Sequence, residues 1–110
     1  MAMTGDEFRT IALSFEGAAE SAHFDRRAFK ARRTFATLAA DENSANILLT
    51  PHEQELYIEQ RPDIFSRVPN KWGDHGWTTA SLAEADAAIF SSALRTAWQA
   101  AARAKGRKRP

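Results

Sequence analysis

The strongest constraint on the fold is a long helical pattern in the last third of the sequence. From Asp86 onward, apolar residues follow three-and-four spacing on an alanine-rich background, at Ile89, Phe90, Ala93, Leu94, Ala97, Trp98 and Ala101. That spacing puts them on one face of an α-helix, and an apolar helix face has to pack against other elements. We therefore predict a helix from residue 86 onward, with this face in the core.

Two further helices are predicted from their start signals. Thr4 and Glu7 have the spacing of a capping box, which indicates a helix over residues 5–15. The segment Thr50-Pro51-His52-Glu53 combines an N-cap threonine, a proline at the first helical position and a glutamate three residues after the cap. This second helix should end near residue 61, because Pro62 disfavours a helical conformation in the residue before it.

The segments between these helices have the patterns of strands. Phe29 and Ala31, followed by Phe35, Thr37 and Ala39, alternate with neighbours of different polarity and predict a β-hairpin. A third strand is predicted at Ile47-Leu48-Leu49, which follows a run of turn formers. Around the turn-rich segment 69–76 we predict two short strands joined by a tight loop.

The predicted order is one helix, three strands, one helix, two strands and one helix. Runs of strands separated by single helices favour an antiparallel sheet, and the alternation typical of a parallel sheet is missing. The predicted fold class is thus α+β with two layers, in the order α-β-β-β-α-β-β-α, with the helices on one face of the sheet. The predicted core consists of Phe8, Ile11, Phe35, Leu38, Ile47, Leu49, Leu56, Ile89, Phe90, Leu94 and Trp98.

The composition is that of one small domain in a reducing compartment. The chain has 110 residues, of which 44% are hydrophobic and 26% are charged, and we predict a single domain over residues 1–102. The chain has no cysteine, which excludes disulfides and thiolate metal sites and favours the cytoplasm. No apolar run approaches the roughly 18 to 20 residues of a membrane span, so no membrane partner is expected.

The charge is unevenly distributed along the chain. Five of the last eight residues are Lys or Arg, which leaves ten basic against fourteen acidic residues in 1–102. The body is therefore acidic, and residues 103–110 are predicted to form a basic, disordered tail.

Catalytic patterns are missing from the sequence. His23, His52 and His75 lie in three different segments without the spacing of a helical metal site. No serine lies in a Gly-x-Ser-x-Gly elbow, and the five glycines form no phosphate-binding loop. We therefore predict a protein that is not an enzyme, with no catalytic residue, cofactor or metal site.

Two surfaces are candidates for binding. The first is a cluster of five cations within eight residues around the predicted hairpin: Arg26, Arg27, Lys30, Arg32 and Arg33. Cations on a two-stranded ribbon can neutralise phosphates, and such a ribbon can enter a DNA groove. The alternative is a solvated hairpin whose arginines pair with nearby acids and protect a strand edge.

The second candidate surface is the loop with Trp72, His75 and Trp77. An indole gives a flat apolar wall for stacking on a base or a small aromatic ligand, and histidine adds a group that titrates near neutrality. The alternative is that the tryptophans close the core of a small domain; by this reading Trp77 is buried and Trp72 is partly exposed.

The same loop, Trp72-Gly73-Asp74-His75-Gly76-Trp77-Thr78, carries a resemblance to a known family. Together with segments 12–18, 29–30, 35–38 and 68–69, it resembles the MmcQ/YjbR family of small bacterial proteins over about residues 5–102. The resemblance implies a two-layer α+β fold similar to secretion chaperones, and a DNA-binding function with which the family is often labelled. Many relatives have two basic residues where this chain has Asp74 and His75, so the loop is less positive here.

Three functions stay open for a binding domain of this type. It binds nucleic acid through the basic hairpin, or another protein as an interaction or chaperone-like module, or a small ligand near the tryptophan loop. The salt dependence of binding separates the first from the second, because phosphate contacts weaken steeply as salt rises. The sequence leaves the oligomeric state undetermined.

Overall fold

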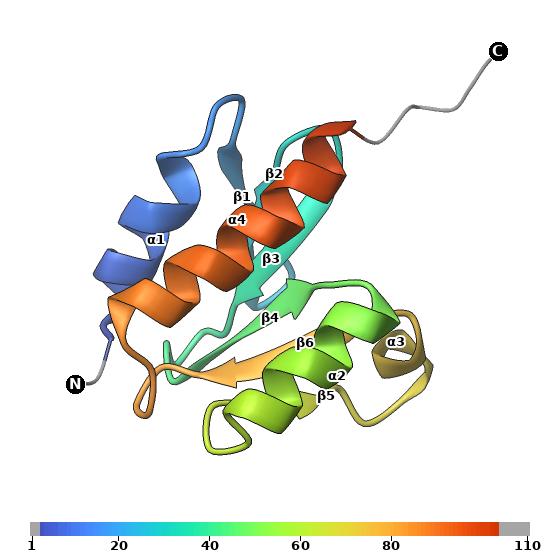
Figure 1. Cartoon of the computed structure of the whole chain (residues 1–110). Coiled ribbons are helices and arrows are strands. Elements are labelled where there is room, and N and C mark those ends of the chain that lie inside the picture. The colour runs from blue at the N-terminus through green and yellow to red at the C-terminus, as the bar shows by residue number, and fades with distance from the viewer. Residues whose placement is uncertain (1–2, 104–110) are drawn as a thin grey trace, which may run out of the picture.

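The computed structural model, which describes residues 3–103, contains a six-stranded antiparallel sheet with helices packed on one face (Figure 1). The elements are α1 (Gly5–Leu13), β1 (Ala19–His23), β2 (Arg26–Lys30), β3 (Thr34–Leu38), β4 (Ser44–Leu48), α2 (Pro51–Gln60), β5 (Phe65–Arg67), α3 (Lys71–Asp74), β6 (Trp77–Ser81) and α4 (Ala87–Arg103). The predicted α+β class and element order are confirmed.

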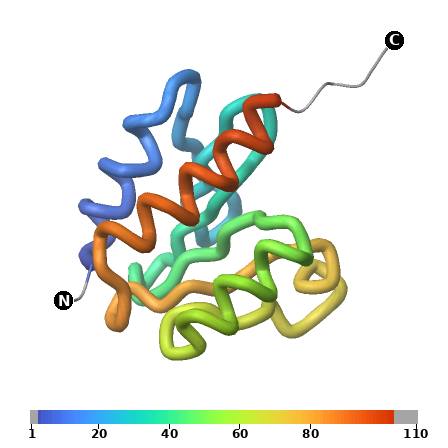
Figure 2. The backbone as a smooth tube through the Cα atoms, in the orientation of Figure 1, coloured from blue at the N-terminus to red at the C-terminus, as the bar shows by residue number. Residues whose placement is uncertain are grey.

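The strands lie in the order β1-β2-β3-β4-β6-β5, and every neighbouring pair is antiparallel. Helices α1 and α4 contact each other and cover the part of the sheet formed by β1 to β4, whereas α2 lies over β5 and β6 (Figures 1 and 2). The short helix α3 lies at the end of the sheet where β6 begins (Figure 1). None of the helices within residues 3–103 combines the length and apolar character that a membrane crossing requires.

Both predicted capping boxes are present. The Thr4 hydroxyl accepts from the backbone N–H of Glu7, whose carboxylate accepts from the backbone N–H of Thr4 at 2.8 Å. Thr50 and Glu53 make the same pair of hydrogen bonds at the start of α2. Each box satisfies backbone donors that a helix start leaves unpaired, which explains why these two starts could be read from the sequence.

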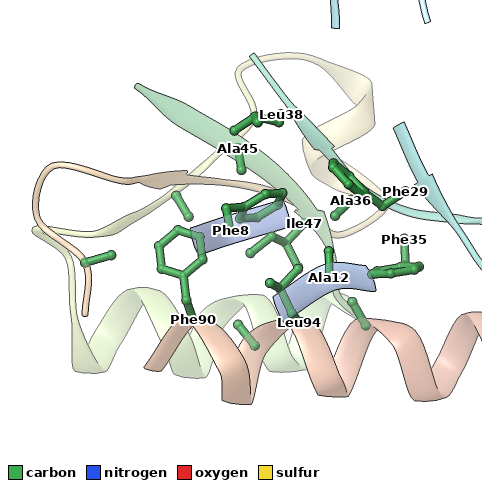
Figure 3. Close-up of a cluster of buried hydrophobic side chains, with 14 of the residues drawn as sticks. Phe8, Ala12, Phe29, Phe35, Ala36, Leu38, Ala45, Ile47, Phe90 and Leu94 are labelled. Atoms are coloured by element: carbon green, nitrogen blue, oxygen red, sulfur yellow. The ribbon is translucent and has the colours of Figure 1, made fainter. Parts of the chain in front are cut away.

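The core lies between α1, α4 and the sheet. Phe8 of α1 makes edge contacts with Phe29 of β2 and Phe90 of α4, with ring centroids 5.4 and 5.9 Å apart. Figure 3 shows Leu94 and Phe90 pointing from α4 toward Ile47 in the sheet. Seven predicted core residues are buried, and Ile11, Ile89 and Trp98 are partly buried against them.

A bulge in β3 adds one phenylalanine to this core. The pairing of β2 with β3 shifts register after Phe29, so that Lys30 pairs with Thr34 while Phe29 pairs with Ala36. Phe35 is the additional residue in β3, and both Phe35 and Ala36 are fully buried. Strict alternation would have placed one of the two on the opposite face, so the bulge allows two successive residues to pack under the helices.

Leu56 was predicted to be buried, and this prediction is wrong. Its side chain is 45% exposed, whereas Gln54 is buried and Tyr57 and Ile58 are partly buried. These three residues have the three-and-four spacing of one helix face, and Leu56 lies outside it. The polar Gln54 sets the inward face of α2, which an apolar pattern does not reveal.

The structure differs from the sequence prediction at two further places. β1 is a strand beyond the five predicted; its five residues are mostly exposed, so its conformation depends on pairing with β2 rather than on an apolar pattern. The predicted tight loop between β5 and β6 contains the short helix α3. The predicted tail lies, from residue 104 onward, outside the described residues.

Candidate functional site

The sheet face opposite α1, α2 and α4, here called the open face, carries polar and cationic side chains. One row of paired residues crosses all six strands on this face: Ser21, Ala28, Thr37, Asn46, Thr79 and Ser66. The six strands contain a single carboxylate, Glu20, which pairs with Phe29 in the row on the helix-covered side. The strands therefore place no negative charge on the open face.

The structure divides the five predicted hairpin cations among three places. Alternation along β2 puts Arg26 and Lys30 on the open face and Arg27 on the helix-covered side. Arg27 makes a 2.7 Å ion pair with Glu20, which also pairs with Arg9 of α1 at 3.1 Å. Arg32 and Arg33 are exposed in the turn between β2 and β3. Whether these residues bind nucleic acid stays a prediction.

A cavity of about 350 Å³ lies on the open face and joins the two predicted surfaces. The hairpin contributes His23, Arg26 and Ala28, and the floor is formed by Thr34, Thr37 and Asn46. The opposite wall consists of Val68, Asn70, Trp72 and Trp77. This volume lies within the range of small-ligand sites, which combine apolar walls with a few oriented polar groups.

Arg26 is the arginine that lines this cavity, and a hydrogen bond to the neighbouring strand holds its side chain in place. Its Nε donates to the Thr37 hydroxyl at 2.9 Å, across the strand pair β2–β3. Its Nη2 is shielded from solvent and has no hydrogen-bond partner within residues 3–103, and no carboxylate in that range forms an ion pair with it. A partly buried guanidinium whose Nη2 lacks an acceptor is costly, and an anionic group entering the cavity would offer this cation a charge-assisted hydrogen bond.

The tryptophan wall is built by the segment between β5 and β6. The Asn70 side chain accepts from the backbone N–H of Trp72 at 2.8 Å and caps α3. Trp72 is 60% exposed, as predicted, whereas Trp77 in β6 is partly buried and pairs with Leu48 of β4. One indole is thus accessible to a ligand, and the second is held in the sheet.

Two glycines make this wall possible. Gly76 has a φ of +108°, and a Cβ added there would collide with the Leu49 carbonyl oxygen. A Cβ at Gly73 would collide with the Val68 carbonyl oxygen. Both glycines of the Trp-Gly-x-x-Gly-Trp-Thr segment therefore allow a close backbone approach that a side chain would block.

Gln54 holds the same segment from the helix-covered side. Its side chain is 1% exposed, and its Nε2 donates to the carbonyl oxygens of Gly73 at 3.1 Å and Trp77 at 3.0 Å. The same nitrogen lies 3.2 Å from the Thr78 hydroxyl. The sequence analysis missed this residue, because a glutamine in a helix gives no signal that distinguishes a buried amide from a solvated one.

Comparison of the sequence with models of known protein families shows to which family this chain belongs. The YjbR family model matches residues 13–100, which is most of the chain. The chain belongs to the YjbR family. The resemblance inferred from the tryptophan loop is thus confirmed.

The fold of this YjbR chain is also found in a solved structure of another protein. The crystal structure of Deinococcus radiodurans protein DR2400, described with the family-model domain DUF419, has a TM-score of 0.79 and 19% sequence identity, covering 98% of this chain and 84% of that chain. At this identity the likeness shows the fold alone. No curated protein sequence matches the chain.

In this YjbR domain, the acidic residue of the tryptophan loop is neutralised. Asp74 forms an ion pair with Arg67 of β5. Its neighbour His75 does not line the cavity with Arg26 and instead lines a second cavity, together with Arg33. Of the three residues predicted at the loop, Trp72 and Trp77 line both cavities, whereas His75 lines only the second.

Phe24 is a further candidate that the sequence analysis missed. It is the first of two turn residues between β1 and β2, is 94% exposed and has a φ of +57°. A positive φ is unfavourable for a bulky residue, and glycine is the usual choice in such a hairpin turn. The ring lies 4.9 Å from that of His23, which lines the cavity, so an exposed aromatic group stands at its edge.

Replacing Phe24 with glycine should stabilise the YjbR domain by about 1 kcal/mol, because glycine adopts the positive φ without strain. Equilibrium urea unfolding would measure this change. Phe24→Ala is the control, since alanine keeps the Cβ that causes the strain and should give no stabilisation. Equal stability of the wild type and the glycine variant would show that the turn is not strained.

Proposed function

We propose that this chain is a non-enzymatic binding domain whose open face binds single-stranded nucleic acid. The observation that carries this proposal is a cavity lined by two tryptophans and by an arginine whose Nη2 lacks a hydrogen-bond partner, on a sheet face to which the strands contribute no carboxylate. Proteins that bind single strands combine cations that contact phosphates with aromatic side chains on which bases stack.

A single strand fits this site better than a duplex. The indole of Trp72 offers a stacking surface, and a base can reach it only when the base is unpaired and free of its neighbours. A ribbon that enters a duplex groove would use cations on both sides of the hairpin, yet Arg27 is paired with Glu20 on the helix-covered side. The phosphate contacts would come from Arg26 and Lys30 on the open face and from the exposed Arg32 and Arg33.

The non-enzymatic part of the proposal comes from the sequence, and the side-chain hydrogen bonds within residues 3–103 are compatible with it. No histidine in this range makes a side-chain hydrogen bond to a hydroxyl or a carboxylate. A base next to the nucleophile is one common way of activating it. We place the protein in the cytoplasm, which the lack of cysteine favours and where single-stranded nucleic acids occur.

Substitution of Arg26 should weaken binding to a single strand by about tenfold, because it removes a charge-assisted hydrogen bond. Fluorescence anisotropy with a labelled 12-nucleotide single strand, as DNA and as RNA, and with a duplex of the same length, would measure the affinity at 50 and 200 mM salt. We expect the single strand to bind more tightly than the duplex, and both affinities to fall as salt rises.

Arg27→Ala is the matched control for Arg26→Ala. It removes the same charge from the next position of the same strand, on the opposite sheet face, while Glu20 keeps its ion pair with Arg9. We expect less than a twofold change in affinity. Equal losses for the two variants would show that net charge, rather than the open face, determines binding. No binding of any probe at 50 mM salt would overturn the proposal.

A further inference from the structure

A second cavity, of about 290 Å³, lies on the other side of the tryptophan wall. Trp72 and Trp77 line both cavities, so the two spaces share one aromatic wall. Arg33 and His75 belong to the second cavity, as Arg26 and His23 belong to the first. Each side of the wall therefore has one arginine and one histidine.

The charge around the two cavities is complementary to a polyanion. None of the residues that line either cavity is Asp or Glu. Within residues 3–103, neither Arg26 nor Arg33 forms an ion pair. A peptide that inserts an apolar side chain would offer these guanidinium groups only neutral carbonyl acceptors, whereas a nucleic acid strand brings one phosphate for each nucleotide.

We propose that the second cavity binds the nucleotide adjacent to the one in the first, so that the ligand unit recognised by this fold is a dinucleotide. This inference rests on the proposed function. The two bases lie on opposite sides of the tryptophan wall, and each cavity contributes one arginine to the phosphates. Insertion of an apolar or aromatic side chain between neighbouring bases is an established way of opening a base step, and a single strand opens without losing base pairs.

The volumes agree with one base on each side. Both cavities are near the lower end of the range for small-ligand sites, a size that suits one base each. The second cavity is bounded by Ala97 and Ala100 of α4 opposite the tryptophans. Small side chains there leave the space for a flat group, and a larger side chain at Ala100 would fill it.

NMR titrations that follow the tryptophan indole signals can test the inference with two defined probes, thymidine 5′-monophosphate and the dinucleotide pTpT. We expect the dinucleotide to bind at least about tenfold more tightly, since each stacked base adds substantial affinity. In Ala100→Phe, the affinity for the dinucleotide should fall to that for the mononucleotide, whose own affinity stays unchanged. Gln99→Phe adds the same ring at an exposed neighbour that does not line the cavity and should alter neither affinity.

Arg33→Ala provides a second variant with an exposed side chain, in case the phenylalanine disturbs α4. It should weaken dinucleotide binding by about fivefold, which is more than it weakens mononucleotide binding. If neither variant changes dinucleotide binding, or if both probes bind equally well, the inference is wrong and the proposed function stands. If neither the mononucleotide, the dinucleotide nor the 12-nucleotide strand binds, the proposed function itself fails.

Discussion

Replacing Leu94 with alanine should lower the free energy of unfolding by about 2 to 5 kcal/mol, the range measured for buried leucines in other cores. Leu94 is fully buried, and Figure 3 places its side chain between α4 and the sheet. The loss combines the removed apolar contacts with the void left among the surrounding phenylalanines and Ile47, which a smaller residue does not fill. Urea unfolding followed by circular dichroism would measure it.

Leu56→Ala is the control for this result, since it makes the same chemical change in another helix. The Leu56 side chain is 45% exposed, so we expect a loss of less than about 1 kcal/mol. A larger loss for Leu56→Ala than for Leu94→Ala would mean that α2 is rotated about its axis from the orientation described here, with Leu56 and not Gln54 in the interior.

Replacing Gly76 with alanine should destabilise the domain by at least about 3 kcal/mol. Two effects act together at this position. The φ of +108° is unfavourable for any residue with a Cβ, and the added carbon would collide with the backbone of Leu49. The collision partner is a carbonyl group in the chain between β4 and α2, which cannot move without disturbing the hydrogen bond from Leu49 N to the Gly76 oxygen at 3.1 Å.

Gly17→Ala separates these two effects. Gly17 also has a positive φ, of +77°, but no neighbouring atom lies within 4 Å of an added Cβ. We expect a loss of about 1 to 2 kcal/mol there from the backbone conformation alone. If the two variants were equally stable, the close approach of Leu49 to Gly76 would not contribute, and the position of Trp77 would have to depend on other contacts.

The elements that the sequence predicted well are those with local signals. The capping boxes at Thr4 and Thr50 are formed within four residues, and the apolar spacing of α4 reflects a helix period that needs no partner to be recognised. β1 gave no such signal, because its residues acquire a strand conformation only by pairing with β2. β5 and β6 were predicted from the turn signals between them, although β5 is only three residues long and pairs with β6 alone.

The candidate site was only partly predictable for a related reason. Trp72, Trp77 and Arg26 were each recognised as chemically suited to binding, but more than forty positions of sequence lie between the arginine and the tryptophans. They come together because β6 lies between β4 and β5 in the sheet, rather than outside β5 at the edge. The separation of Arg26 from Arg27 depends on the alternation of one strand, which a count of charges along the sequence does not resolve.

The amide of Gln54 ties the free energy of folding to that of ligand binding. The tryptophan wall is attached to α2 through the carbonyls of Gly73 and Trp77, so any opening of α2 also releases the surface on which a base would stack. A ligand that requires the assembled wall binds the folded state alone and must raise the unfolding temperature as its concentration increases. Conversely, a substitution that lets α2 separate from the sheet would lower ligand affinity under conditions where circular dichroism still reports a folded domain.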